Sequence, residues 1–260
     1  GVLSVCHKFG YGLVIHPCEN DSPELIQRLR ELLDSSRMDG LVLTPPMTEN
    51  QELLDFLVSS GTPYVLISPL DNSQSELSVS VDDSVITQQA IQSLIDFGHQ
   101  RIGFITGVRK RSGSEMRLLG YQQALEKNNI SYDESLIVQG NFTFGSGVVA
   151  AQELLRHENP PTAIFASNDY MAAGVMKVAL QLRISIPHEL SLCGFDDTPV
   201  AGYMSPGLTT IRHPLEQLAS HAGELLIRQL KKHTQPFEAK TLKSELILRG
   251  STGPVNNKPY

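Results

Sequence analysis

The fold of this 260-residue chain is constrained most by an alternation of short apolar runs with longer amphipathic stretches. Each apolar run precedes a stretch whose apolar residues recur at helical spacing, which is typical of βαβ units built on a parallel sheet. The predicted strands are residues 12–16, 40–44, 64–68, 101–106, 136–139, 162–166, 189–195 and 243–249. The predicted helices are residues 22–35, 49–60, 84–97, 115–128, 146–157, 170–182 and 215–232. The sequence therefore predicts an α/β fold with parallel sheets.

So many strands exceed what one small sheet needs, and we expect two subdomains. The polar segment 71–78 and the segments 208–213 and 233–239 fit three crossings between them. The expected subdomains are residues 1–81 plus 211–236 and residues 82–210 plus 237–253. Ligands prefer the clefts between such subdomains.

The first residues are predicted to form a helix that ends at Gly10, because glycine commonly closes helices. A helix that opens the chain and leads into a strand implies another strand upstream. The fragment is therefore expected to begin inside an α/β domain.

Two apolar runs late in the chain stop at residues that can hydrogen-bond a small polar molecule. The run 162–166 ends at Ser167-Asn168-Asp169, and the run 189–193 ends at Gly194-Phe195-Asp196-Asp197. Ligands of open parallel sheets sit outside the carboxyl ends of strands, so Asn168 and Asp196 would face one crevice. Helix capping is the alternative for all four polar residues, and one member of each pair can cap while the other binds.

Two further residues lie at positions where ligand contact and a structural role compete. Phe142 follows the predicted strand 136–139, where an aromatic ring either stacks on a ligand or plugs the domain edge. Arg117 lies near the start of a predicted helix; its guanidinium suits hydroxyls or anions, and a solvated helix arginine is the alternative. Without other information, the solvated helix arginine is the better explanation.

Signatures of common catalytic and metal sites are missing from the sequence. It has no G-x-S-x-G elbow, no P-loop, no C-x-x-C pair and no H-E-x-x-H motif, so we expect no catalytic residues, no metal and no cofactor. Residues 145–150 match G-x-G-x-x-A, but five residues separate them from the preceding strand. Thr143 or Ser146 capping a helix explains this segment better than a dinucleotide site does.

Charge and cysteine content bear on partners and compartment. The formal net charge of −7 argues against direct DNA contact by this chain, since phosphate contacts need basic residues. No apolar run is long enough to cross a bilayer, and no signal peptide is visible. Three cysteines cannot all pair, which favours a reduced, cytoplasmic compartment.

The chain resembles the effector-binding core of the LacI/GalR family of bacterial transcription regulators. The resemblance spans nearly the whole chain. It rests on Val81-Asp82-Asp83, residues 97–105 (FGHQRIGFI), residues 117–121 (RLLGY), residues 167–174 (SNDYMAAG), Gly194-Phe195-Asp196-Asp197, residues 206–211 (PGLTTI) and residues 249–252 (RGST). One departure is Arg183, where the family mostly has a glycine closing the helix.

The resemblance implies two Rossmann-like subdomains of periplasmic-binding-protein type, joined by three crossovers, that dimerise and bind a small effector in the cleft. Operator DNA would be bound by an N-terminal helix-turn-helix that this sequence lacks. Carried over position by position, the implied effector-binding residues are Arg117, Phe142, Asn168, Asp196, Arg111, Thr44 and Ser68.

The sequence thus predicts a sensor whose effector is a sugar, a glycoside or a nucleoside-type compound. A periplasmic sugar-binding protein of a transporter is an alternative with the same fold and cleft. A nicotinamide enzyme using the glycines near Ser146 is a third hypothesis, from another class.

Overall fold

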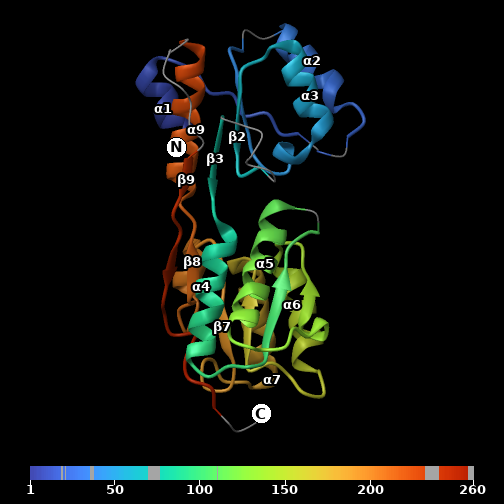
Figure 1. The fold of residues 1–260 in the computed structure, drawn as a ribbon, viewed down its shortest axis with the longest axis vertical. Coiled ribbons are helices and arrows are strands. Elements are labelled where there is room, and N and C mark those ends of the chain that lie inside the picture. Colours follow the sequence, from blue (N-terminus) through green and yellow to red (C-terminus); the bar gives the residue numbers. More distant parts are fainter. Residues whose placement is uncertain are drawn as a thin grey trace. The chain divides into compact units, whose positions relative to one another are not determined.

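Parallel strands form one sheet in each of two units of the chain (Figure 1). The computed structural model describes residues 1–18, 20, 22–35, 38–69, 77–109, 111–231 and 240–256. Unit 1 comprises Gly1–Val81 and Pro214–Leu242, and unit 2 comprises Asp82–His213 and Lys243–Tyr260. The predicted α/β fold with two parts is confirmed. None of the described helices is both long and apolar enough to cross a membrane.

Unit 1 is built on a parallel sheet with strand order β1-β2-β3-β9. Its strands are β1 (Leu41–Leu43), β2 (Tyr64–Ile67), β3 (Ser78–Val81) and β9 (Lys240–Leu242). Its helices are α1 (Val2–Phe9), α2 (Leu25–Ser35), η1 (Met47–Glu49), α3 (Gln51–Ser60) and α9 (Leu215–Leu230). One core joins Val65 and Val79 of the sheet to α9, against which α1 packs. A second core joins Leu41 and Tyr64 to α2 and α3.

Unit 2 is a three-layer arrangement around the parallel sheet β5-β4-β6-β7 (Figure 1). The strands are β4 (Ile102–Thr106), β5 (Ile137–Gln139), β6 (Ala163–Ala166) and β7 (Ser191–Cys193). The helices are α4 (Asp83–Asp96), α5 (Ser112–Lys127), η3 (Glu134–Leu136), α6 (Phe144–Leu155), α7 (Asp169–Leu182) and α8 (Pro199–Tyr203). Phe104 faces the core under α4 and α5, and its neighbour Ile105 faces the core under α6 and α7, as strand alternation requires.

A separate antiparallel pair completes unit 2 and changes the predicted boundaries. β8 (Thr210–Arg212) pairs with β10 (Glu245–Ile247), so residues 211–213 belong to unit 2 and not to the N-terminal part. β9 pairs with β3, which assigns Lys240–Leu242 to unit 1. The predicted crossing at 71–78 lies mostly outside the described residues, as does that at 233–239; the division near residue 81 agrees with the sequence.

The strand predicted at residues 12–16 is wrong. Val14 and Ile15 are 71% and 82% exposed, and the segment has no ladder partner among the described residues. A strand is stable only when a neighbour satisfies its backbone groups, which the apolar sequence does not reveal. Together with β1, the segment lines an apolar cavity of about 730 Å³ in unit 1.

Glycines close two helices of unit 1, as predicted for Gly10, and an arginine closes α7 in the same way. Gly10 and Gly61 close α1 and α3 in the left-handed conformation. Arg183 does the same for α7 with φ 59°; its N–H donates to the carbonyl of Leu180, and the N–H of Ile184 donates to the carbonyl of Ala179. The turn expected of a glycine is therefore kept, and the helix is not lengthened. The left-handed conformation costs a non-glycine residue ~1 kcal/mol.

Candidate effector site

The site begins where β6 and β7 end side by side in unit 2. Phe165 of β6 is in register with Cys193 of β7, so the turns that follow both strands lie at one edge of the sheet. The backbone N–H of Asp169 donates to the carbonyl of Phe195 at 2.9 Å, which joins the two turns. The structure therefore brings the turns of Asn168 and Asp196 together, as the sequence predicts.

Arg117 is buried at this edge and is not a solvated helix residue. Only 8% of it is exposed. Its Nε donates to Oδ2 of Asp83 at 2.9 Å, its Nη1 donates to the carbonyl of Ser167 at 2.5 Å, and its guanidinium lies 3.6 Å from the ring centre of Phe195. Nη2 donates to none of the described residues, so its two N–H groups are available to a ligand.

Asp196 is the acceptor that the site leaves open. It is half-buried, and no described residue donates a hydrogen bond to its carboxylate. Burial raises the pKa of this carboxyl to about 6; Arg117 acts against the rise, while the charge of Asp169 adds to it. Its φ of 107° lies in a region that side chains rarely adopt, and such backbone strain concentrates at functional sites.

The neighbouring carboxylate of Asp197 already accepts hydrogen bonds from side chains of the protein. Asp197 accepts from Arg212 at 2.8 Å and from Arg249 at 2.6 Å. Although burial acts to raise the pKa of Asp197, these two arginines hold it below its ordinary value. Neither Asp196 nor Asp197 caps a helix, because α8 begins after Thr198.

Asp169 is fully buried and accepts from Thr198 and Thr210. Burial raises its pKa, and those hydrogen bonds only partly oppose the rise. The Asp169 side chain therefore has a structural role, because its hydrogen bonds with Thr198 connect the start of α7 to the residue before α8.

Asn168 and Phe142 are held by contacts within the protein. Asn168 caps α7 through Oδ1, which accepts from the N–H of Met171 at 2.9 Å, and its Nδ2 donates to the carbonyl of Phe142 at 2.9 Å. The capping alternative thus describes Asn168, although its second amide hydrogen has no described partner. The Phe142 ring lies against Gly107 so closely that a Cβ there would be 1.9 Å from it. Effector contact by both residues stays a prediction.

The other predicted residues lie at the ends of strands or helices. Arg111 is half-buried and immediately precedes α5. Thr44 and Ser68 follow the paired strands β1 and β2 in unit 1, at the same edge of that sheet. Ser68 has φ 50°, a strained conformation like that of Asp196. Their contact with an effector also stays a prediction.

In the segment 145–150, Gly147 serves helix packing. Oγ1 of Thr143 accepts from the N–H of Ser146 and caps α6, as the sequence predicts. A Cβ on Gly147 would lie 2.3 Å from the carbonyl oxygen of Met171 on α7. The motif is therefore explained by the close approach of α6 and α7.

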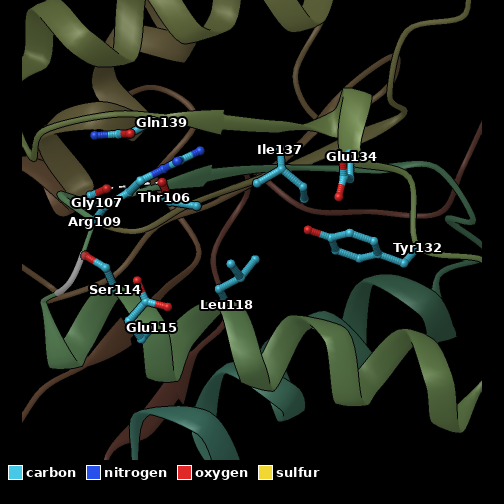
Figure 2. Close-up of a pocket in the computed structure, with 10 residues that line it drawn as sticks. All are labelled: Thr106, Gly107, Arg109, Ser114, Glu115, Leu118, Tyr132, Glu134, Ile137 and Gln139. Carbon is cyan, nitrogen blue, oxygen red and sulfur yellow. Dashed lines mark hydrogen bonds between the residues drawn. The ribbon is translucent and has the colours of Figure 1, made fainter. Parts of the chain in front are cut away.

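A pocket of about 450 Å³ lies elsewhere in unit 2, along α5 and β5 (Figure 2). Its described lining is Thr106, Gly107, Arg109, Ser114, Glu115, Leu118, Tyr132, Glu134, Ile137 and Gln139. Figure 2 shows Arg109 and Gln139 at one end and Tyr132 with Glu134 at the other. Arg117, Asn168 and Asp196 of the cluster at the ends of β6 and β7 do not line it, although Gly107 of its lining lies against the ring of Phe142.

Three residues of the cluster were not predicted as part of the site: Asp83, Phe195 and His213. Asp83 is in the Val81-Asp82-Asp83 motif, and Phe195 is in the Gly194–Asp197 turn, so the motifs contained both. His213 follows β8 and has no local signal. Its side chain lies 3.5 Å from Asp83 and is tilted against the ring of Phe195, which only tertiary contact reveals.

Comparison with known proteins identifies the family of the chain. The family model for a periplasmic binding protein-like domain matches residues 91–252. A regulatory protein of the LacI family from Chloroflexus aggregans superimposes with a TM-score of 0.88 at 28% identity, over 97% of this chain and 90% of that one. The ribose operon repressor of Haemophilus influenzae is 32% identical over 251 residues, which are 96% of this chain and 75% of the repressor. The chain belongs to the LacI family of transcriptional regulators.

Another LacI-type relative has a ligand bound. The transcriptional regulator CelR, solved as a cellobiose complex, matches with a TM-score of 0.88 and 29% identity over 96% of this chain and 76% of its own. Each of the three proteins is named as a regulator, and none is named as an enzyme or a transport protein. Among the described residues, no three His, Cys, Asp or Glu side chains are grouped to hold a metal ion.

Proposed function

We propose that this chain is the effector-sensing core of a cytoplasmic LacI-family regulator and that unit 2 binds the effector through Asp196 and Arg117. The observation that carries the proposal is the open carboxylate of Asp196 near a buried guanidinium with two uncommitted N–H groups. Acceptor and donor together suit the vicinal hydroxyls of a sugar or glycoside.

The charge of the cluster favours a neutral effector. The carboxyl of Asp196 feels the charges of two further carboxylates, Asp83 and Asp169, and of one guanidinium, which Asp83 already pairs, so an anion would meet no surplus of positive charge. A polyhydroxylated compound can accept from Arg117 and donate to Asp196 without adding charge. Cellobiose, the ligand in the complex of the similar regulator CelR, belongs to this class, and another relative is named as the repressor of a ribose operon.

The first test is a thermal-shift screen with ribose, cellobiose, other mono- and disaccharides, nucleosides and purines, followed by calorimetric titration. A ligand at about 100 times its Kd adds ~2.7 kcal/mol of stability, which is an easily measured shift. The nicotinamide hypothesis predicts instead a shift with nicotinamide dinucleotides.

Asp196→Asn keeps the shape of the side chain and removes its charge, so it is expected to weaken the best compound of the screen ~10- to 100-fold, as loss of a charged hydrogen-bond partner does. The matched control is Glu126→Gln on the exposed face of α5, which should bind as the wild type does. Wild-type affinity in Asp196→Asn would show that the effector binds elsewhere.

The proposed response is a population shift. The effector would favour one arrangement of the two units through contacts that differ between arrangements. An N-terminal helix-turn-helix domain of the full regulator would convert that shift into a change of operator affinity. Fluorescence anisotropy on operator DNA with and without the effector tests this; equal operator affinity under both conditions would refute it.

We further propose that the regulator is a homodimer that uses an aromatic surface of unit 2. Phe144, Tyr170 and Tyr203 are 41%, 49% and 85% exposed, and they lie on α6, α7 and α8. α7 packs against both other helices, and Lys177 of α7 lies 5.5 Å from the ring of Phe144. Exposed aromatic residues of this kind are enriched at protein interfaces.

A further inference from the structure

A buried carboxylate that the proposed function does not use holds the site arginine in place. The Asp83 side chain is only 9% exposed, and its Oδ2 accepts from Nε of Arg117 at 2.9 Å. Its Oδ1 lies 3.5 Å from Nε2 of His213, outside hydrogen-bond geometry. Burial acts to raise the pKa of Asp83, but Arg117 and His213 outweigh it and keep that pKa below its ordinary value. Asp83 is therefore a buried negative charge in the folded chain.

The contacts of Arg117 explain why such a charge matters for binding. Asp83 accepts a hydrogen bond from Nε, the carbonyl of Ser167 accepts one from Nη1, and the ring of Phe195 covers one face of the guanidinium. A planar guanidinium held at these places leaves Nη2 in one orientation. A group held in advance loses less entropy when a ligand arrives, which strengthens binding.

We propose that Asp83 is a positioning residue of the effector site, which fixes Arg117 so that Nη2 meets the effector. The inference rests on the proposed function of Arg117 and Asp196, and it assigns to Asp83 no contact with the effector itself. Asp83 is the second residue of unit 2, and His213 is the last residue before the chain returns to unit 1. The carboxylate of Asp83 therefore pairs with Arg117 and lies near His213, next to two of the points at which the chain passes between the units.

The matched pair Asp83→Asn and Asp82→Asn tests the proposal. Both variants remove one negative charge from adjacent residues. Asp82 is exposed and caps α4 by accepting from the N–H of Val85, a role that asparagine fills equally well. Calorimetric titration would use whichever of ribose, cellobiose, guanosine and hypoxanthine most stabilises the wild type. We expect Asp83→Asn to weaken this probe ~10-fold and Asp82→Asn to bind it within twofold of the wild type.

Two further measurements separate positioning from general loosening of unit 2. The Nε–Hε signal of Arg117 in the NMR spectrum of the ligand-free protein should shift and exchange faster with water in Asp83→Asn, and should be unchanged in Asp82→Asn. In an Arg117→Lys background, which lacks the guanidinium that Asp83 orients, Asp83→Asn should change affinity by less than twofold. An equal tenfold loss in both backgrounds would overturn the proposal.

The outcomes also distinguish this inference from the proposed function. Wild-type affinity in Asp83→Asn, together with loss of binding in Asp196→Asn, refutes the role of Asp83 alone. If none of the four probes binds the wild type, the effector class is refuted. In that case the Nε–Hε signal of Arg117 still tests the role of Asp83, because this measurement needs no ligand. An unchanged signal in Asp83→Asn would show that Asp83 does not fix the guanidinium.

Discussion

At the scale of single residues, adjacent carboxylates of the same type have opposite roles. Asp197 accepts from two arginines and has a lowered pKa, whereas Asp196 has no described donor and a pKa raised to about 6. Burial acts on both, so the difference lies in the hydrogen bonds that each receives. The open carboxylate costs stability in the unliganded protein, as binding sites often do.

That cost predicts a pH dependence. The pKa of Asp196 is about 6 in the folded chain and about 4 when unfolded, so the folded state holds the extra proton between these values. The stabilisation that the folded state gains from this raised pKa is fully present below about pH 4. It is lost as the pH rises through about 6. Asp196→Asn should therefore match the wild type near pH 4 and exceed it by ~1–3 kcal/mol at pH 7.5. Urea unfolding at both pH values measures the difference, and a pH-independent difference would contradict the pKa assignment.

The two members of the proposed site differ in what their removal does to folding. From the sequence, Asp196 and Arg117 look like equivalent cleft residues. In the structure Arg117 neutralises buried Asp83, so truncating the arginine leaves an unpaired buried charge and destabilises unit 2. Variants of Arg117 therefore lose stability as well as ligand contacts, whereas Asp196→Asn is expected to lose ligand contacts without losing stability.

At the scale of elements, the distance between α6 and α7 depends on a small residue at their contact as well as on the apolar residues that they bury. α6 and α7 approach at Gly147, where a side chain would meet the backbone of Met171. Gly147 is also part of the segment that resembles a dinucleotide motif. The requirement for glycine at this position is steric and comes from α7, the next helix of the chain.

Gly147→Ala is expected to lower the free energy of unfolding by ~1–3 kcal/mol, because overpacking outweighs the ~1 kcal/mol that alanine adds to a helix. Gly145→Ala is the matched control, since its Cβ would have only Oγ1 of Thr143 nearby, at 4.0 Å. This control should be neutral or slightly stabilising. Equal effects of the two substitutions in chemical denaturation would show that α6 and α7 can separate without cost.

At the scale of the whole molecule, the proposed dimer depends on a surface that no local pattern marks. Tyr203→Asp places a charge where an aromatic ring is 85% exposed, and it should raise the dimer dissociation constant at least ~10-fold. Leu119→Asp on α5, at a residue 37% exposed, is the control. Sedimentation equilibrium measures both; a monomeric wild type, or a Tyr203→Asp dimer of unchanged affinity, would contradict the proposed interface.

The sequence by itself determined the α/β class, nearly all helices, the strands built from apolar runs and the turns that carry Asn168 and Asp196. These are set by local periodicity, capping residues and glycine ends, all of which act within a few residues. The tertiary structure decided the rest. It rejected a strand at residues 12–16, created β3, β8 and β9 from short polar segments through pairing, and assigned residues 211–213 to unit 2. It also brought Asp83 to Arg117, and His213 to Asp83 and Phe195. Such contacts join residues far apart in the chain, and the burial and pairing of charges that decide them exist only once the chain has folded.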